Sequence, residues 1–496
     1  MNVLLIYPEF PDTFWSFKHA LRFIHKKSSS PPLGLLTIAA MLPKEWNLKL
    51  VDTNVQKLTQ KDLKWADYAF ISGMAVQRDS ARTIIERCKS MHVKVVAGGP
   101  LFIYEYEDFK NVDHFVLNEA EITLPLFLQD LEQGCAKRIY RSTQFAALED
   151  TPLPVWSLID MDKYASMNVQ YSRGCPFNCD FCNITALFGH TPRVKKTEKM
   201  IEELDSLYQA GWRRGIFFVD DNLIGNKKVL KEELLPAIIE WKKDKKGIVF
   251  NTEVSINIAD DPELIALMVA AGFTKVFIGI ETPDENNLAE CNKKHNLNRN
   301  LLEDVKLLHQ KGLQVQGGFI VGFDHDSPKT FQSLLDFIQQ SGIVTAMVGI
   351  LQAPPGTKLF DRMSKSGRIN NKMSGDNVDG STNLIPKMEM EILKNEYNEL
   401  VQTLYSPAGY YQRVKTFLQD YTLPKIKMNI NLSFIVENLM AFLGSIIRLG
   451  IFSKERMYYW KLFFWTLFHK PSSFAQAITF SIYGYHFRKI CDLYIQ

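Results

Sequence analysis

Short apolar runs alternate with helical stretches twice along this chain, and this alternation restricts the possible folds more than any other feature. The first alternation lies within residues 1–150 and the second within residues 166–355. Short strands separated by helices form βαβ units, in which the strands pair in parallel. The sequence therefore predicts an α/β protein with two separate parallel sheets.

The first alternation resembles a Rossmann-type binding domain in its spacing. Its expected strands are Val3–Tyr7, Leu48–Val51, Tyr68–Ser72, Val93–Ala97 and His114–Leu117. Small or polar residues follow several of them, and ligands of open α/β sheets bind at these carboxyl ends. No Gly-x-Gly-x-x-Gly string follows the first run, so a nicotinamide cofactor is not favoured.

The second alternation predicts a partial βα barrel. Its expected strands are Met167–Tyr171, Gly215–Val219, Val249–Glu253, Lys275–Ile280, Val315–Val321 and Thr345–Leu351. Pro152 and Pro154 interrupt the pattern before it, as in a linker. We therefore expect four parts: a Rossmann-like domain over 1–147, a linker over 148–165, a barrel over 166–370 and a mainly helical domain over 371–496.

The C-terminal part is rich in aromatic and aliphatic residues. Its longest apolar stretches, Leu439–Ile447 and Tyr458–Phe468, are followed or broken by a cation. A spanning helix needs about 20 apolar residues, so we do not expect either stretch to cross a membrane. Two interpretations stay open, a helical cap on the barrel and an interfacial helix that faces lipid headgroups. The cations of that interfacial helix would be Arg448, Lys454, Arg456 and Lys461.

Charge and cysteine usage exclude several classes of protein. The 58 basic residues against 55 acidic ones give a net charge of +3, which does not favour a nucleic-acid partner. Three of the seven cysteines fall within eight residues, unlike the even spacing of a secreted disulfide framework. No signal peptide is evident after Met1. We expect a cytoplasmic protein.

Those three cysteines are Cys175, Cys179 and Cys182, and they form the most specific motif in the chain. Thiolates suit zinc or iron–sulfur clusters. A structural zinc site needs four protein ligands, and His190 is a candidate fourth ligand, so zinc stays open. Three thiolates on a [4Fe-4S] cluster leave one iron open to a substrate or cofactor. Phe181 would shield the cluster from water.

This cysteine loop resembles the cluster motif of the radical S-adenosylmethionine (SAM) superfamily. The Rossmann-like region before the barrel resembles that of the cobalamin-binding subfamily, or class B. The helical C-terminus resembles that of the hopanoid C-2 methylase group. The strings that carry the similarity besides the cysteine loop are Tyr7-Pro8, Pro31–Leu35, Gly98–Pro100 and Phe218–Asn222.

The resemblance implies that the open iron binds the amino and carboxylate groups of SAM, whose reductive cleavage yields a 5′-deoxyadenosyl radical. Asp220 and Asp221 would receive the amino group, although either carboxylate at this position can instead cap the next helix. Gly318 would approach adenine, although close packing explains a strand glycine equally well. The SAM contacts implied are Phe181, Asp220, Asp221, Asn222, Glu253, Glu281 and Gly318.

The resemblance also implies cobalamin across the strand ends of the N-terminal sheet. No Asp-x-His-x-x-Gly string occurs, so we expect no histidine ligand to cobalt, and a domain without cobalamin stays open. Met74 and Gln77 would lie beneath the cofactor. The nucleotide tail would lie against Ser72, Gly73, Gly98 and Gly99.

The resemblance implies a cobalamin-dependent C-methyltransferase that acts on a small-molecule or lipid substrate, such as an isoprenoid, and this is the first of three hypotheses. A radical SAM cyclase, oxidase or rearrangement enzyme without methyl transfer is the second. A non-catalytic iron–sulfur or zinc binding protein is the third. For the enzyme we expect an external electron donor of the flavodoxin or ferredoxin type, no nucleic acid, and peripheral membrane contact through the C-terminal region.

Overall fold

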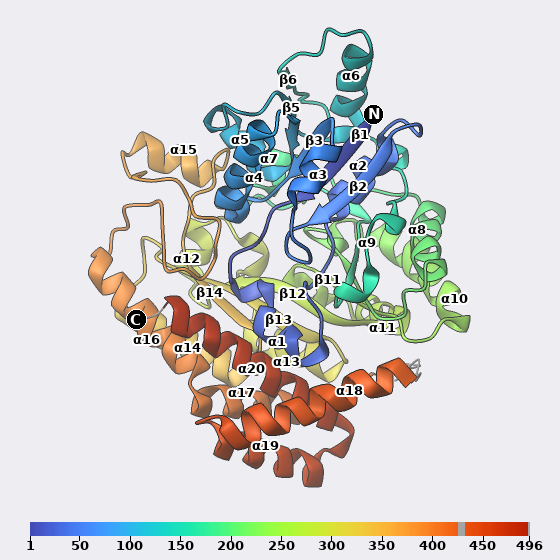
Figure 1. The fold of residues 1–496 in the computed structure, drawn as a ribbon. Coiled ribbons are helices and arrows are strands. Elements are labelled where there is room, and N and C mark those ends of the chain that lie inside the picture. The colour runs from blue at the N-terminus through green and yellow to red at the C-terminus, as the bar shows by residue number, and fades with distance from the viewer. Residues whose placement is uncertain (425–431, 495–496) are drawn as a thin grey trace.

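A computed structural model of the chain describes residues 1–424 and 432–494. It contains two six-stranded parallel sheets and a helical C-terminal part. In Figure 1 the N-terminal sheet is blue, the second sheet runs from green to yellow, and the C-terminal helices form the orange and red base. The predicted α/β fold class is confirmed.

The N-terminal sheet has the strand order β2-β1-β3-β4-β5-β6. Its strands are β1 (Asn2–Tyr7), β2 (Asn47–Asp52), β3 (Tyr68–Ser72), β4 (Lys94–Gly98), β5 (His114–Val116) and β6 (Ile139–Tyr140). Its main helices are α2 (Leu33–Met41), α3 (Gln60–Trp65), α4 (Arg78–Ser90), α5 (Pro100–Glu105) and α6 (Ala120–Glu132). Five strands match the predicted ones, and β6 is an additional short edge strand. All neighbours pair in parallel, as in a Rossmann-type sheet.

The second sheet has the strand order β14-β13-β12-β11-β10-β7 and is also parallel throughout. Its strands are β7 (Met167–Val169), β10 (Gly215–Phe218), β11 (Val249–Glu253), β12 (Phe273–Glu281), β13 (Gln314–Val321) and β14 (Ala346–Ile350). The helices that follow these strands include α8 (Thr197–Gln209), α10 (Leu235–Trp241), α11 (Pro262–Ala271), α13 (Leu301–Gln310) and α14 (Pro328–Ser341). Six strands in sequential order make the partial barrel that the sequence predicts.

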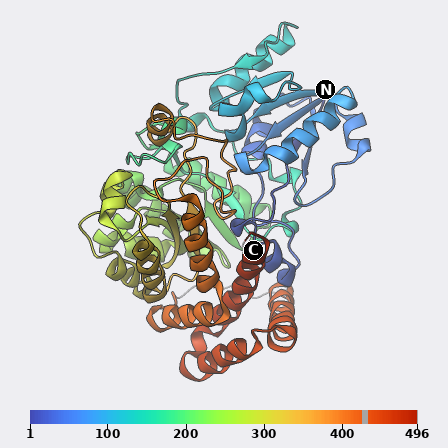
Figure 2. The same cartoon turned by 90° about the vertical axis from the view of Figure 1, so that its left-hand side faces the viewer.

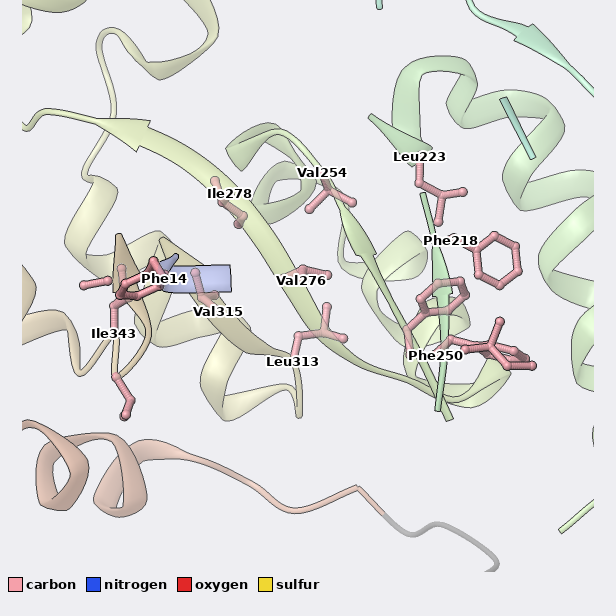
Figure 3. Close-up of a cluster of buried hydrophobic side chains, with 14 of the residues drawn as sticks. Phe14, Phe218, Leu223, Phe250, Val254, Val276, Ile278, Leu313, Val315 and Ile343 are labelled. Carbon is pink, nitrogen blue, oxygen red and sulfur yellow. The ribbon is translucent and has the colours of Figure 1, made fainter. Parts of the chain in front are cut away.

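Alternate residues of the second sheet face opposite environments. Val276 and Ile278 of β12 are fully buried, as is Phe250 of β11, and Figure 3 shows them within the hydrophobic cluster along these strands. Lys275 and Phe277, on the other face of β12, remain partly accessible. The outer face therefore supplies the core, while the inner face keeps accessible side chains.

The C-terminal part is helical, as predicted. Its helices are α16 (Met390–Tyr405), α17 (Pro407–Asp420), α18 (Leu432–Ser445), the π-helical segment Ile446–Phe452, α19 (Arg456–His469) and α20 (Phe474–Tyr494). Phe14, from the N-terminal segment, stacks on Phe487 of α20 with ring centroids 4.3 Å apart. Figures 1 and 2 both show this blue segment leaving the N-terminal sheet toward α20.

We expected neither apolar stretch of the C-terminal part to be long enough to cross a membrane. The stretch Leu439–Ile447 belongs to a longer helix, because the π-helical turns continue α18 past Ser445. The 18 residues Ile435–Phe452 are long and apolar enough to cross a membrane by length and composition. Length and composition alone are weak evidence for a span, because helices packed on a protein body can pass the same test.

Candidate active site

The cysteine loop lies at the mouth of the partial barrel, between β8 (Ser172–Arg173) and α7 (Ile184–Phe188). Cys175, Cys179 and Cys182 are all partly accessible free thiols. Gly174, with φ of +93°, lets the chain turn into the loop, since a Cβ there would lie 2.9 Å from the carbonyl oxygen of Thr191. The loop therefore presents three thiols from a tight turn.

The donor set bears on the choice between zinc and a cluster. Among residues 1–424 and 432–494, no three or more His, Cys, Asp or Glu side chains are arranged to hold a single metal ion. His190 and the three cysteines thus form no ready zinc site. A four-iron cluster is larger than one ion and needs thiolates only at its corners, so this donor set fits a cluster better.

Asp220 holds the strand that leads into the cysteine loop. Its carboxylate accepts hydrogen bonds from the backbone N–H of Tyr171 at 3.1 Å and from the hydroxyl of Ser172 at 2.6 Å. Burial raises the pKa of Asp220 to about 6 despite these bonds. Asp220 caps no helix, and the N-cap of the turn after β10 is Asn222, without a side-chain cap.

Asp221 and Glu253 come from the ends of neighbouring strands, and within residues 1–424 and 432–494 neither forms an ion pair. Burial, followed by the charge of Asp220, raises the pKa of Asp221 to about 7. Burial, followed by the charge of Asp221, raises the pKa of Glu253 to about 8. Desolvated carboxylates of like charge resist ionisation until a donor or cation satisfies them. The pair therefore fits a ligand that brings N–H or O–H donors.

Asn222 lies between the cysteine loop and the end of β11. Its Nδ2 is 4.0 Å from Sγ of Cys175, and its Oδ1 accepts from the backbone N–H of Ser255 at 3.2 Å. Both ends of this amide are therefore engaged by the protein. The structure thus gives Asp220 and Asn222 anchoring contacts, and leaves Asp221 as the free carboxylate of the predicted segment.

Glu281 lies in a strained backbone conformation, with φ of +64°, beside a lysine that the sequence analysis did not select. Its Oε1 accepts from Nζ of Lys293 at 2.6 Å. Burial lowers the pKa of Lys293, whereas Glu281 and the nearby Cys179 raise it. Their combined effect is larger than that of burial, so the net shift is upward. The ammonium also lies 5.7 Å from the ring of Phe181. No local pattern marks Lys293, because only the fold brings it to the cysteines.

Gly318 lies inside β13, on the inner face. A Cβ at this position would come within 2.7 Å of Cζ of Phe277. Packing against this ring accounts for the glycine without a contact to adenine.

A second element of the site is a cavity of about 300 Å³ at the carboxyl ends of the N-terminal strands. Ser72, Gly98 and Gly99 line it, as expected for a ligand of an open α/β sheet. A Cβ at Gly98 would lie 2.6 Å from the carbonyl oxygen of Val116, so the backbone there has no room for a side chain. The radical SAM half of the chain also contributes to the lining, through β8, α7 and the residues that follow β7, β10 and the cysteine loop. These lining residues are Gln170, Arg173, Leu187, Phe188, Lys195 and Val219.

Three predicted cobalamin residues do not line this cavity. Gln77 is buried, and its amide donates to the carbonyl of Pro8 at 2.5 Å and accepts from the backbone N–H of Met74 at 2.8 Å. Met74 is exposed, and the nearest atoms to a Cβ at Gly73 lie 3.7 Å away. Gln77 therefore anchors the loop after β3, and its side chain is not free to contact a ligand.

Comparison with known proteins agrees with this geometry. Residues 169–338 match the model of the radical SAM superfamily, and residues 357–496 match a domain of unknown function, DUF4070. The chain is 40% identical over 492 residues to an uncharacterized methyltransferase of Synechocystis sp., covering 98% of this chain and 91% of that protein. It is 33% identical over 420 residues to the hopanoid C-2 methylase of Rhodopseudomonas palustris, covering 83% and 78%. The chain belongs to the hopanoid C-2 methylase group of radical SAM enzymes.

Radical SAM membership makes this chain an enzyme that uses a [4Fe-4S] cluster and SAM, and the two relatives above are named as a methyltransferase and a methylase. The fold is that of cobalamin-dependent members. A TM-score of 0.63 relates it to the cobalamin-dependent SAM radical enzyme OxsB with aqua-cobalamin bound, over 99% of this chain and 80% of that one, at 14% identity. The prediction of a radical SAM enzyme of the hopanoid C-2 methylase group is confirmed, and the fold is of the predicted class B type. The roles of individual residues stay predictions.

Proposed function

We propose that this radical SAM methyltransferase is cobalamin-dependent and methylates carbon in a largely apolar small-molecule or lipid substrate. The observation that carries the proposal is that the two candidate sites are adjacent. Arg173 lines the cavity at the ends of the N-terminal strands, and it also belongs to β8, the strand that leads into the cysteine loop. A cofactor bound in that cavity would adjoin the cluster loop across one protein wall. With both groups bound, the cluster and SAM would supply the radical that removes a substrate hydrogen, and cobalamin would supply the methyl group.

Within this proposal, Cys175, Cys179 and Cys182 bind the cluster. Asp221 and Glu253 accept hydrogen bonds from SAM, because their carboxylates carry no ion pair and their pKa values are raised. Asp220 is a positioning residue that fixes the entry to the cysteine loop. Together these groups bind and orient SAM beside the thiols.

The cobalamin part of the proposal rests on Ser72, Gly98 and Gly99, which line the cavity. Backbone exposed by glycine allows a bulky ligand to approach closely. Since no Asp-x-His-x-x-Gly string occurs and Gln77 is engaged by backbone, we propose that no side chain of this loop ligates cobalt.

The inner face of the barrel is the proposed substrate surface. Phe277 packs edge-to-face on Trp15 with centroids 5.5 Å apart, and the indole N–H of Trp15 lies 2.9 Å from Sδ of Met347. Lys275 lies on the same face of β12 as Phe277. An aromatic and thioether lining favours an apolar body, and Lys275 would receive one polar or anionic group.

Cofactor stoichiometry and product analysis test the proposal. Anaerobically purified, cluster-reconstituted protein is expected to bind about four irons and one cobalamin per chain, and with a chemical reductant to convert SAM to 5′-deoxyadenosine. Four irons without cobalamin would leave SAM cleavage standing and would contradict cobalt-dependent methyl transfer. The absorbance spectrum of bound cobalamin supplies the second readout, since cobalamin without a nitrogen ligand on its lower face differs visibly from histidine-ligated cobalamin.

We also propose that the enzyme works inside the cell, takes electrons from a flavodoxin- or ferredoxin-type donor, and contacts the membrane peripherally through its C-terminal helices. The exposed apolar helix after α17 supports the membrane contact. The net charge of +3 gives no support to a nucleic-acid partner.

A further inference from the structure

Exposed apolar side chains are concentrated on the C-terminal helices. Among the described residues, 23 large hydrophobic side chains are exposed, and 13 of them lie between positions 435 and 468. Phe452 is 79% exposed, Phe468 is 75% exposed and Met457 is 64% exposed. A contiguous exposed apolar surface of this kind marks a site of contact with a protein or a membrane.

The helix formed by α18 and the π-helical segment has two distinct faces. Ala441, Ser445 and Leu449, spaced by four residues, are buried against the protein. A second set with the same spacing, offset by two residues, points outward and is exposed; it comprises Ile435, Leu439, Leu443, Ile447 and Ile451. Positions four apart share a helix face, so the outward face is an apolar stripe without a partner in the chain described.

Polar contacts fasten this helix to the protein body. Glu437 forms an ion pair with Arg214 at 2.6 Å and lies 3.6 Å from Lys26. The hydroxyl of Ser445 lies 2.9 Å from that of Tyr459 in α19. A helix fixed along one side by ion pairs and packing cannot be surrounded by lipid. The helix is therefore suited to lie along a bilayer surface and not to cross it.

The exposed, unpaired charges around the apolar stripe are positive. Arg448, Lys454, Arg456 and Lys461 are exposed, and within the described chain none of them forms an ion pair with a carboxylate. The acidic residues between 435 and 468 are Glu437 and Glu455, and both are paired with arginine. An apolar stripe flanked by unpaired cations matches the acyl boundary and the anionic headgroups of a membrane leaflet.

We propose that the outward face of α18, the π-helical segment and α19 docks this enzyme on an anionic membrane, with the helices lying in the plane of the interface. The inference deepens the proposed function, because a membrane surface is where a lipid substrate is found. We call this surface the docking face; its members are the 13 exposed hydrophobic residues and the four cations above.

Vesicle flotation of the full-length holoenzyme tests the inference. The wild type is expected to float with vesicles of phosphatidylglycerol and phosphatidylcholine, and to bind vesicles of phosphatidylcholine alone about tenfold more weakly. Phe452→Ser combined with Phe468→Ser removes apolar anchors and is expected to abolish flotation. Lys454→Glu combined with Arg456→Glu is expected to abolish the preference for the anionic lipid.

Control variants make the same kinds of change at exposed residues outside the docking face. Leu126→Ser with Ile392→Ser removes two exposed hydrophobic side chains, and Lys64→Glu with Lys110→Glu reverses two exposed cations. Both controls are expected to float like the wild type. Thermal unfolding followed by circular dichroism shows whether each variant is folded, and 5′-deoxyadenosine formation is measured separately, so loss of docking and loss of catalysis are distinguished.

Two results would overturn the inference. A wild type that stays at the bottom of the gradient with anionic vesicles would remove the membrane as partner. A wild type that is dimeric by light scattering, with the Phe452 and Phe468 variant monomeric and vesicle binding unchanged, would assign the docking face to a second copy of the chain.

Discussion

Nη2 of Arg173 lies 2.8 Å from Oε1 of Glu121, and this ion pair joins the strand before the cysteine loop to the first turn of α6 beside the cavity. Glu119, one position before α6, accepts from Arg173 at 3.2 Å and from Arg193 at 2.8 Å. Burial raises the pKa of Glu121, whereas the ion pair with Arg173 lowers it by more, so the net shift is downward. The network therefore fixes the two proposed cofactor sites relative to each other.

Arg173→Ala is expected to lower the free energy of unfolding by about 3 kcal/mol, because it leaves Glu121 as a buried carboxylate without its cation. Urea unfolding measures the change. Arg138→Ala, at an exposed arginine just before β6, is expected to stay within about 0.5 kcal/mol of the wild type. Arg173→Ala combined with Glu121→Gln should recover part of the loss, and equal losses in the single and double variants would contradict a coupled pair.

Substitutions of the adjacent residues Asp220 and Asp221 are expected to affect different properties, iron content for Asp220 and SAM binding for Asp221. Asp220→Ala leaves the N–H groups of Tyr171 and Ser172 without their acceptor, so iron content after reconstitution is expected to fall. Asp221→Asn is expected to keep the iron and weaken SAM binding by about tenfold, the loss of one charge-assisted hydrogen bond. Iron assay and equilibrium dialysis separate the two. Equal iron loss in both variants would reject the division of roles.

The raised pKa of Glu253, about 8, predicts a pH dependence of stability in the protein without SAM. Between its ordinary value and about 8 the folded chain binds more protons than the unfolded chain, so stability falls as pH rises through this window and levels off above it. Glu253→Gln is expected to flatten the slope and raise stability at high pH by on the order of 1–2 kcal/mol. Asp221, with a pKa of about 7, should retain part of the slope. Identical slopes in wild type and variant would contradict the burial of this carboxylate.

Gly98→Ala tests the cavity as a cofactor site. The new Cβ would meet the carbonyl oxygen of Val116 at 2.6 Å, so β4 or β5 must shift and the lining of the cavity must change. Cobalamin affinity, measured by titration of the absorbance spectrum, is expected to fall at least about tenfold. Gly215→Ala in the second sheet, where the nearest atom would lie 3.7 Å away, is the matched control and should bind like the wild type.

Local patterns in the sequence were sufficient for the sheets and for the cysteine loop. The period of apolar runs depends on near neighbours, so the strands β3 and β11 fall on their predicted bounds. The π-helical turns after Ser445 carry no such local pattern, so the sequence alone does not show that the helix containing Leu439–Ile447 continues to Phe452. A glycine in a sequence shows only that space is needed, so both packing and an adenine contact explained Gly318. The ring of Phe277, from the neighbouring strand, supplies the packing explanation, and the adenine contact stays a prediction.

The sequence by itself determined the fold class, the enzyme family and the three thiols, because strand periodicity and the cysteine spacing are properties of short segments. Tertiary structure alone decided which carboxylate is free and which is an anchor. Asp220 and Asp221 are adjacent in sequence, yet one is turned toward Tyr171 and the other lies near Glu253. Lys293 reaches the cysteine loop across more than a hundred residues for the same reason. Charge, burial and hydrogen bonding depend on what surrounds a side chain, and only the folded chain supplies those surroundings.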